Sequence, residues 1–387
     1  MLKNGLKGTI LLIILLFISS TVSATDFDPT KPITSSMMKN ILIELEKSNP
    51  DIIKLDIIGK SHDNKEIYSV RLGNGNVEIL IGGSIHARER ITTNIILQNI
   101  KDYIKAYRNN TKIDGYNVKA LLNQVTITFV PMINPDGVDY TIEGKNSIKD
   151  SMLREAIGYI EPHPNNISYT DSRWKANIVG VDLNRNWNVS WDMVQKYEID
   201  RPSDAHFKGY FPMSQPEVIA LKNLSISKPY IGYYSYHTQG HVLYWYTNQK
   251  GQDLEELKDV TRAIQRYTRF RLDPNINNIK RDEKPKKGYI SWTSVKLHKP
   301  SLVVEFANGR YSEKDFWKIY KRSKAIPLIT SNKALKYKDL YKYNVFVTNK
   351  LVQKYKSLER AKTFCNDFIE KDKKAIIKYE GKVVYSK

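Results

Sequence analysis

The chain has 387 residues, a formal net charge of +20 and a hydrophobic content of 41%. This composition predicts a globular protein with a sizeable core and excludes a chain that is disordered along its length. The positive charge favours anionic surroundings such as wall polymers, a membrane surface or acidic peptides. The lysines are spread along the sequence without an arginine-rich cluster, so we expect no nucleic-acid partner.

The amino-terminal segment has the pattern of a secretory signal. Lys3 and Lys7 precede an apolar run over residues 10–18, and Val22-Ser23-Ala24 offers small residues for cleavage. We therefore predict a signal peptide over residues 1–24 and a secreted protein, extracellular or associated with the cell wall. A retained anchor is the alternative, but the apolar run is short for a bilayer span. No integral membrane anchor is expected after cleavage.

The fold is expected to begin directly after this segment. Apolar residues at helical spacing follow Ser35, and Pro50 closes that helix. Two strands are predicted over residues 52–58 and 67–72, and a third over residues 77–81.

Two candidate metal ligands follow the third strand. Gly82 and Gly83 end the strand, and His86 and Glu89 come next, three residues apart. The carboxyl end of a strand is where open α/β sheets place their chemistry, and imidazole nitrogen and carboxylate oxygen both bind zinc well. The pair alone is weak evidence, because most such matches are ordinary surface pairs. A catalytic zinc requires a third protein ligand.

The next segments supply polar residues on turns and loops. A strand over residues 125–130 leads to an Asn134-Pro-Asp-Gly turn, and a long polar stretch over residues 144–178 is of the kind that lines sites. It leads to Asn184 and Arg185. The guanidinium of Arg185 is suited to binding a carboxylate, although for this residue alone a structural ion pair is the favoured interpretation.

The third ligand and a general base are predicted at the ends of two later strands. His237 follows an aromatic strand over residues 230–236 and is the preferred third ligand, with His241 as second choice. Glu305 closes an apolar strand that begins at Ser301. Burial of an unpaired carboxylate is costly, whereas beside a metal it can accept a proton from water and return it to a leaving amine. A salt bridge to a lysine is the alternative.

These motifs together resemble the zinc carboxypeptidase family typified by carboxypeptidase A, over about residues 35–330. The resemblance lies in the order and approximate spacing of the motifs, which are His86-x-x-Glu89, Asn134-Pro-Asp-Gly, residues 180–187, His237 and Glu305. It implies an α/β fold with a mixed sheet of roughly eight strands between helices. It also implies one zinc ion held by His86, Glu89 and His237, with Glu305 as general base and Asn184 with Arg185 gripping the substrate's terminal carboxylate.

Three positions bear on how far the resemblance extends. Lys175 stands where animal members have the arginine that stabilises the oxyanion, and a lysine is a point charge rather than a planar fork. Glu283 stands near the place of a mobile tyrosine that often caps the substrate. Ile290 falls where the family reads the terminal side chain, which suggests a neutral or apolar one.

The resemblance leaves two substrates open. The segments around Trp174 and His237 are similar to the bacterial branch that cuts the γ-D-glutamyl to diaminopimelate bond of cell-wall peptides, whereas Arg185 is retained as in exopeptidases. A secreted, monomeric metallocarboxypeptidase acting on peptides is the leading interpretation, and a wall-peptide endopeptidase is the alternative. An inactive wall-binding protein is disfavoured, because all three ligands and Glu305 are present.

The carboxyl-terminal residues predict a small accessory module over 340–387, after a catalytic domain over 25–335. The pattern is β-α-β-β, with a strand over 343–348, a helix capped by Ser357 and a hairpin over 375–385. Cys365, the only cysteine, lies on the apolar face of that helix and is read as core; alone, it excludes an intrachain disulfide. The lysines of the module motivate a hypothesis of binding to anionic wall polymers.

Overall fold

The computed structural model describes residues 27–387 except for 167–169, 278, 280–285 and 309–310. The predicted signal segment and Glu283 lie outside the described residues. Among those described, no helix combines the length and apolar character needed to cross a bilayer.

The centre of the molecule is a mixed eight-stranded sheet in the order β1-β2-β6-β3-β7-β10-β8-β9. Its strands are β1 (Ile53–Lys60), β2 (Glu66–Leu72), β3 (Val77–Gly82), β6 (Val125–Val130), β7 (Tyr230–Thr238), β8 (Val242–Tyr244), β9 (Arg271–Asp273) and β10 (Ser301–Phe306). The inner strands β6, β3, β7 and β10 run parallel. Every residue of β3 and β6 is buried, as expected for parallel strands that are covered on both faces.

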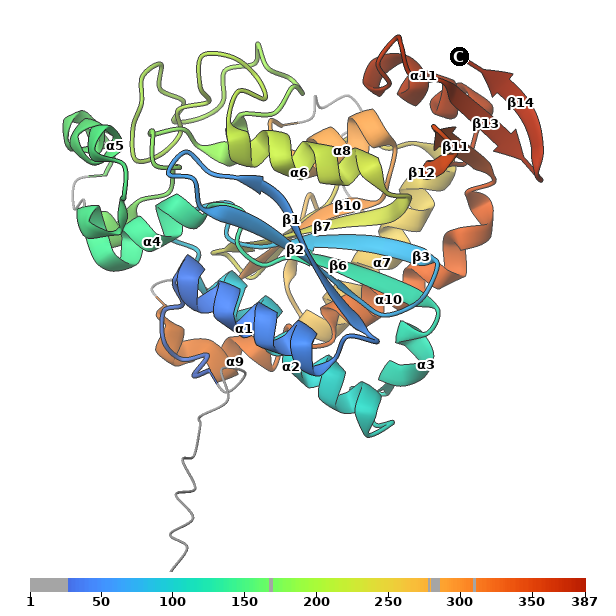
Figure 1. Ribbon diagram of the computed structural model, residues 1–387, viewed down its shortest axis with the longest axis horizontal. Coiled ribbons are helices and arrows are strands. Elements are labelled where there is room, and N and C mark those ends of the chain that lie inside the picture. Colours follow the sequence, from blue (N-terminus) through green and yellow to red (C-terminus); the bar gives the residue numbers. More distant parts are fainter. Residues whose placement is uncertain (1–26, 167–169, 278, 280–285, 309–310) are drawn as a thin grey trace, which may run out of the picture.

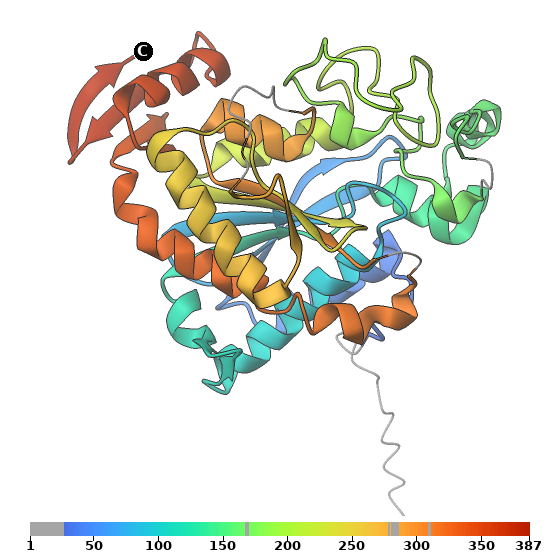
Figure 2. The same cartoon turned by 180° about the vertical axis from the view of Figure 1, so that it is seen from behind.

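Helices cover both faces of this sheet (Figures 1 and 2). On one face lie α6 (Pro216–Ser227) and α8 (Tyr289–Leu297); on the other lie α1 (Ser35–Ser48), α2 (Ile91–Arg108), α7 (Gly251–Thr268), α9 (Phe316–Tyr320) and α10 (Ile326–Tyr337). Shorter elements are α3 (Val118–Leu122), α4 (Pro135–Glu143), α5 (Ser151–Ala156) and the hairpin of β4 (Lys112–Ile113) and β5 (Tyr116–Asn117). The predicted sheet between two helix layers is confirmed.

The long polar stretch before Trp174 is less irregular than its sequence indicates. It contains α5 and three 3-10 turns, Gly144–Ser147, Ile157–Tyr159 and Asp171–Arg173. The Asp150 side chain caps α5 by accepting hydrogen bonds from the Met152 and Leu153 amides at 2.8 and 3.0 Å. A further 3-10 turn, Leu183–Arg185, carries the predicted carboxylate-binding residues.

The tail forms a second, four-stranded antiparallel sheet that packs with α11 (Leu358–Phe368). Its strands are β11 (Tyr343–Val347), β12 (Lys350–Tyr355), β13 (Ala375–Tyr379) and β14 (Lys382–Ser386). The β-α-β-β prediction missed β12, because lysines interrupt its apolar pattern. The turn before it was the overlooked signal: Thr348 and Asn349 both have left-handed φ angles, 48° and 64°, as a two-residue hairpin turn requires. Ser357 caps α11 and Cys365 is buried, as predicted.

The tail shares packed contacts with the larger sheet's helices. The Phe368 ring lies 5.8 Å from the Trp292 ring of α8. Between the two units the buried Lys299 ammonium lies over the rings of Tyr341 and Tyr355, at 4.6 and 4.5 Å. It also donates a hydrogen bond to the carbonyl of Lys354. The tail is therefore joined to the part of the chain that carries the larger sheet through buried side chains.

Candidate active site

The loop after β3 is held in place by close backbone packing. A side chain at Gly83 would not fit, because a Cβ there would lie 2.9 Å from Ile96 and 3.1 Å from the carbonyl of Pro131. Ser84 has a left-handed φ of 47°, and its amide donates to the Thr92 hydroxyl at 2.8 Å. These contacts turn the chain sharply, so that His86 and Glu89 point toward the end of β7.

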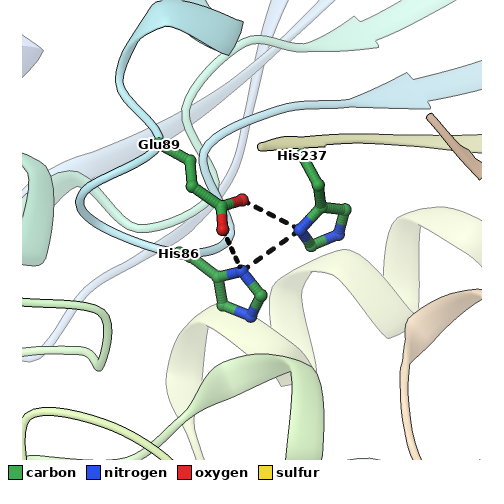
Figure 3. Close-up of side chains that lie close together, drawn as sticks. All are labelled: His86, Glu89 and His237. Atoms are coloured by element: carbon green, nitrogen blue, oxygen red, sulfur yellow. Dashed lines mark hydrogen bonds and ion pairs between the residues drawn. The ribbon is translucent and has the colours of Figure 1, made fainter. Parts of the chain in front are cut away.

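His86, Glu89 and His237 converge on one point (Figure 3). Nδ1 of His86 lies 2.8 Å from Oε1 of Glu89, and Nδ1 of His237 lies 2.9 Å from Oε2. The two Nδ1 atoms are 3.1 Å apart. All three residues are buried. Burial by itself would raise the pKa of Glu89, but the two histidine rings outweigh it and lower that pKa overall.

This geometry fits a zinc ion. Zinc binds histidine nitrogen and carboxylate oxygen at about 2.0–2.2 Å in tetrahedral geometry, which places ligand atoms about 3.3 Å apart. The observed separations of 2.8–3.1 Å approach that value. Two imidazole nitrogens that face each other this closely need a proton or a cation between them. The predicted ligand set is therefore brought together as a metal site.

Polar groups lie behind both histidine rings, as a hydrogen-bond partner for His237 and as a nearby carboxylate for His86. Nε2 of His86 lies 3.3 Å from Oδ1 of the fully buried Asp182, and Nε2 of His237 lies 3.0 Å from the Ser235 hydroxyl. Carboxylate and hydroxyl groups of this kind orient ligating histidines and raise their basicity. Neither Asp182 nor Ser235 was predicted. Asp182 stands only two residues before Asn184, and a buried acid in that motif was the available signal.

Glu305 lies directly beside the metal cluster. In the parallel pairing of β10 with β7 it is the register partner of His237, so the two side chains emerge from neighbouring strands. Its Oε2 atom is buried and has no hydrogen-bond partner within the described parts of the chain. Burial raises the pKa of Glu305 to about 8, although His237 acts in the opposite direction. A bound dication would lower this pKa toward the range of a general base.

A cavity of about 300 Å³ opens beside the cluster. His86, His237 and Glu305 line one end of it, and Asn184 and Ile290 line it farther along. The Oδ1 atom of Asn184 accepts a hydrogen bond from the Tyr289 amide at 3.1 Å, which ties the Asn184 turn to the first turn of α8. Asn184 and Ile290 thus line the same cavity as the metal cluster and Glu305.

The cavity is not uniformly apolar. Asp273 and Lys286 also line it, on segments that sequence reasoning did not single out. Asp273 makes an ion pair with Arg271 at 3.3 Å, and the Lys286 ammonium lies 5.9 Å from the centre of the Tyr244 ring. A ligand in this cavity therefore meets charged groups of both signs beside the aliphatic Ile290.

Lys175 and Arg185 converge on Asp182. Nζ of Lys175 lies 2.8 Å from Oδ2 of Asp182, and Nε of Arg185 lies 3.4 Å from the same oxygen. Although burial would raise the pKa of Asp182, Lys175, His86 and Arg185 hold it well below its usual range. Arg185, predicted to bind the terminal carboxylate, and Lys175, predicted to stabilise the oxyanion, therefore both lie beside Asp182. The other carboxylate oxygen of Asp182 lies near His86.

Arg185 is held from its other side by a second carboxylate. Its Nη1 atom lies 3.7 Å from Oε2 of Glu198 and is buried without a hydrogen bond among the described residues. Glu198 also pairs with Lys208 at 3.4 Å and with Lys287 at 2.6 Å. Lys287 lines the cavity and has no exposed side-chain surface. Glu198 and Lys287 were not predicted as parts of the site.

His241 does not join the metal cluster. Its ring stacks on Phe270 at 4.9 Å with an interplanar angle of 19°. It lines a different cavity, together with Ala307 and Arg322. Of the two candidates for the third ligand, His237 is therefore the one at the site.

Comparisons with known proteins agree with this geometry. The family model described as "Zinc carboxypeptidase" matches residues 38–311. That family uses one catalytic zinc, and the cluster of His86, Glu89 and His237 fits it.

Among relatives, gamma-D-glutamyl-L-diamino acid endopeptidase 1 of Lysinibacillus sphaericus is 31% identical over 274 residues, 71% of this chain and 65% of that protein. Carboxypeptidase A4 of Mus musculus is 25% identical over 244 residues, 59% of this chain and 52% of that protein. The chain thus spans less than two thirds of the length of these relatives.

Solved structures confirm the fold alone. The thrombin-activatable fibrinolysis inhibitor superposes with a TM-score of 0.62 at 18% identity, covering 82% of this chain and 77% of that one. Carboxypeptidase A from Helicoverpa armigera gives a TM-score of 0.56 at 18% identity, with 83% and 78% covered.

Proposed function

The chain belongs to the zinc carboxypeptidase family, and from this premise we propose that it releases a diamino acid residue from the carboxyl end of a peptide. The bond cut is the amide between that residue and a preceding γ-linked glutamyl residue. We further propose that the enzyme acts outside the cell, because the first 24 residues have the pattern of a secretory signal, and that it acts as a monomer.

The observation that carries the proposal is the mixed charge of the cavity beside the zinc ligands. Its volume of about 300 Å³ suits a single amino acid residue. Asp273 suits a side-chain ammonium group, Lys286 suits a second carboxylate, and Ile290 suits the methylene chain between them. A purely apolar terminal side chain would leave Lys286 without a carboxylate partner, whereas Asp273 would keep its ion pair with Arg271 at 3.3 Å.

Similarity to a known enzyme supports the same substrate. The Lysinibacillus relative, which matches 71% of this chain, is named for a bond between γ-D-glutamate and an L-diamino acid. We transfer that bond to this chain as a proposal, because the cavity residues accommodate its leaving group.

The site residues divide the chemistry among them. Bound zinc supplies a Lewis acid that polarises the scissile carbonyl and makes water a better nucleophile. Glu305 accepts the proton of the attacking water and passes it to the departing nitrogen. Lys175 offers a positive charge for the oxyanion that develops, held by Asp182 at 2.8 Å.

Arg185 determines whether a free terminal carboxylate is required. Its Nη1 atom is a buried donor without a hydrogen bond among the described residues, and Arg185 does not line the cavity beside the zinc ligands. Its guanidinium must therefore turn toward that cavity to bind such a carboxylate. Exopeptidase action is therefore the first candidate. Endopeptidase action is the second candidate, because the relative from Lysinibacillus sphaericus is named an endopeptidase.

A digest of three peptides tests the proposal. The zinc-loaded protein is incubated with a γ-D-glutamyl-diaminopimelate tripeptide, the same peptide extended by D-alanine, and a linear α-peptide pool, and the products are identified by mass spectrometry. Cleavage of the tripeptide in preference to the extended peptide is expected. Equal cleavage of both would establish the endopeptidase alternative, and cleavage of the pool alone would overturn the proposed substrate. Activity that survives a chelator would overturn the zinc mechanism.

A further inference from the structure

The sheet of the tail has one face packed on α11 and one face turned away from it. Val345 of β11 and Ile377 of β13 are register partners, and both are fully buried in the core that α11 shares. Successive side chains of a strand point to opposite faces of the sheet. Phe346 and Ile376, which are also register partners, therefore lie on the other face, and both are half-buried. We call this second face the outer face of the tail.

Two lysines share the outer face with these apolar residues. Lys378 alternates with Ile376 along β13, and its ammonium lies 5.0 Å from the centre of the Phe346 ring. Lys374 directly precedes β13 with the same alternation and is exposed. Across the sheet, Lys378 is the register partner of the exposed Val383 in β14. The outer face thus combines positive charge with apolar side chains.

The strands of the tail carry lysines but no acidic residue. The acidic residues of the tail lie on α11, on the loop after it and on the turn between β13 and β14: Glu359, Asp367, Glu370, Asp372 and Glu380. Glu370 pairs with Lys373 at 2.8 Å, whereas neither Lys374 nor Lys378 forms an ion pair with any described residue. Three more exposed lysines stand at strand ends: Lys342, Lys350 and Lys382. The charge of the outer face is therefore not neutralised by the sheet itself.

We propose that the outer face of the tail binds a linear polyanionic polymer of the cell wall, in which phosphodiester groups are joined by short carbon units. The choice of a wall polymer rests on the proposed action outside the cell. Lysine binds phosphate oxygens as a point charge, and Phe346 and Ile376 offer contact to the carbon units. Lys374 and Lys378 lie four residues apart along an extended chain, about 13 Å, so that a polymer with closely repeated charges meets both.

Such a polymer suits the outer face better than a nucleic acid does. Proteins that bind single strands stack successive bases on several aromatic rings. Within the described tail, the strand registers place one aromatic ring on the outer face, that of Phe346, and Lys378 already lies over it. A flexible polymer of small units requires no stacking platform.

The tail joins the larger sheet at the end opposite the metal cluster. Gln353 of β12 donates hydrogen bonds to the carbonyls of Ser225 and Lys228, which precede β7, whereas His237 lies near the carboxyl end of that strand. A strand of nine residues spans roughly 30 Å. A polymer on the outer face therefore leaves the cavity beside Glu305 open to a peptide.

Sedimentation with purified cell walls tests the inference. The zinc-loaded protein is mixed with Gram-positive walls that carry a polyglycerol-phosphate polymer, and with the same walls after acid extraction of that polymer. Binding to the intact walls should weaken with added salt, because exposed charges are screened. K374Q combined with K378Q should weaken it roughly 10- to 30-fold, as expected for two lysines beside an anionic surface, whereas K374R combined with K378R should retain it.

A matched control separates the outer face from net charge. K47Q combined with K105Q removes two exposed lysines on α1 and α2 that form no ion pair within the described ranges, and should leave wall binding unchanged. Equal binding to extracted walls, or an equal loss in both double variants, would overturn the inference. Tighter binding to vesicles of anionic phospholipid or to DNA than to the polymer would also overturn it.

Activity on a soluble peptide distinguishes this inference from the proposed function. The variants at Lys374 and Lys378 should hydrolyse the γ-D-glutamyl-diaminopimelate tripeptide at the rate of the unmodified protein, because the outer face lies away from the cavity. A protein that binds intact walls through these lysines but cleaves no such peptide would overturn the proposed function alone.

Discussion

The two halves of the active site are built in different ways. The metal half, with His86, Glu89, His237 and Glu305, emerges from the ends of parallel strands, and the register of β10 on β7 places Glu305 beside His237. The binding half, with Asp182, Arg185 and Glu198, lies on turns and loops and is held by ion pairs. Regular backbone therefore positions the predicted zinc ligands and Glu305, whereas compensated buried charge positions the residues that we propose bind the substrate.

Substitution of Glu305, the proposed general base, should have the largest effect on activity. E305Q removes the proton acceptor but keeps the shape of the side chain, so kcat should fall by about 10²- to 10⁴-fold. Zinc content, measured by elemental analysis, should be unchanged, because Glu305 is not a ligand. A variant that loses zinc together with activity would contradict the role assigned to Glu305.

Substitution of Glu198 should lower the stability of the protein, because Glu198 holds together the ion pairs of the binding half. E198Q removes the carboxylate that pairs with the buried Lys287 ammonium at 2.6 Å and leaves that ammonium its hydrogen bond to the Met193 carbonyl, which costs about 3 kcal/mol in the free energy of unfolding. K287M combined with E198Q should recover much of that loss. Denaturant titration of the two single variants and the double variant measures the coupling. A coupling near zero would show that solvent already screens the pair.

Substitution of Asp182 tests the link between the two halves. D182N keeps an acceptor 3.3 Å from His86 but removes the charge shared with Lys175 and Arg185, so zinc affinity should fall by about 10- to 100-fold. Chelator competition measures that affinity. S235A, which removes the neutral partner of His237, is the comparison and should have a smaller effect. A larger effect for S235A would place the controlling contact on β7 instead.

Glu217, a buried carboxylate with no cationic partner among the described residues, gives the most specific effect, because it changes only the pH dependence of stability. Burial, with Asp136 nearby, raises the pKa of Glu217 to about 8, and its nearest donor is Asn177 at 3.4 Å. The folded chain therefore keeps a proton that the unfolded chain releases near pH 4.5. The free energy of unfolding should fall as pH rises from about 4.5 to 8, by at most about 1.4 kcal/mol per pH unit.

The E217Q variant should lose this part of the pH dependence. Chemical denaturation across pH 5 to 8 measures it, and the exposed Glu255, changed to glutamine, serves as control. Parallel curves for E217Q and the unmodified protein would contradict the raised pKa.

The difference between groups on strand ends and groups on loops also explains which site residues the sequence could predict. The strand ends that carry His86 and His237 follow from short apolar runs closed by polar residues, and Glu305 is conspicuous at the end of an apolar strand. The partners of Arg185 are not encoded locally, because Glu198 and Lys287 reach the site only through loop packing. The charges of Asp273 and Lys286 carried no signal either, since isolated charged residues in loops are usually solvated. Strand β12 was hidden by its lysines, although the Thr348-Asn349 turn preceded it.

Lys299 has a consequence for how the molecule unfolds. It is buried at the joint between the tail and the catalytic part, beneath Tyr341 and Tyr355. The Gln353 side chain also donates hydrogen bonds across the joint, to the carbonyls of Ser225 and Lys228 at 3.0 and 2.8 Å. Detachment of the tail would expose these groups unpaired. Heating should therefore melt both sheets in one cooperative calorimetric transition, and a protease should not release an intact catalytic core by cutting near residue 340.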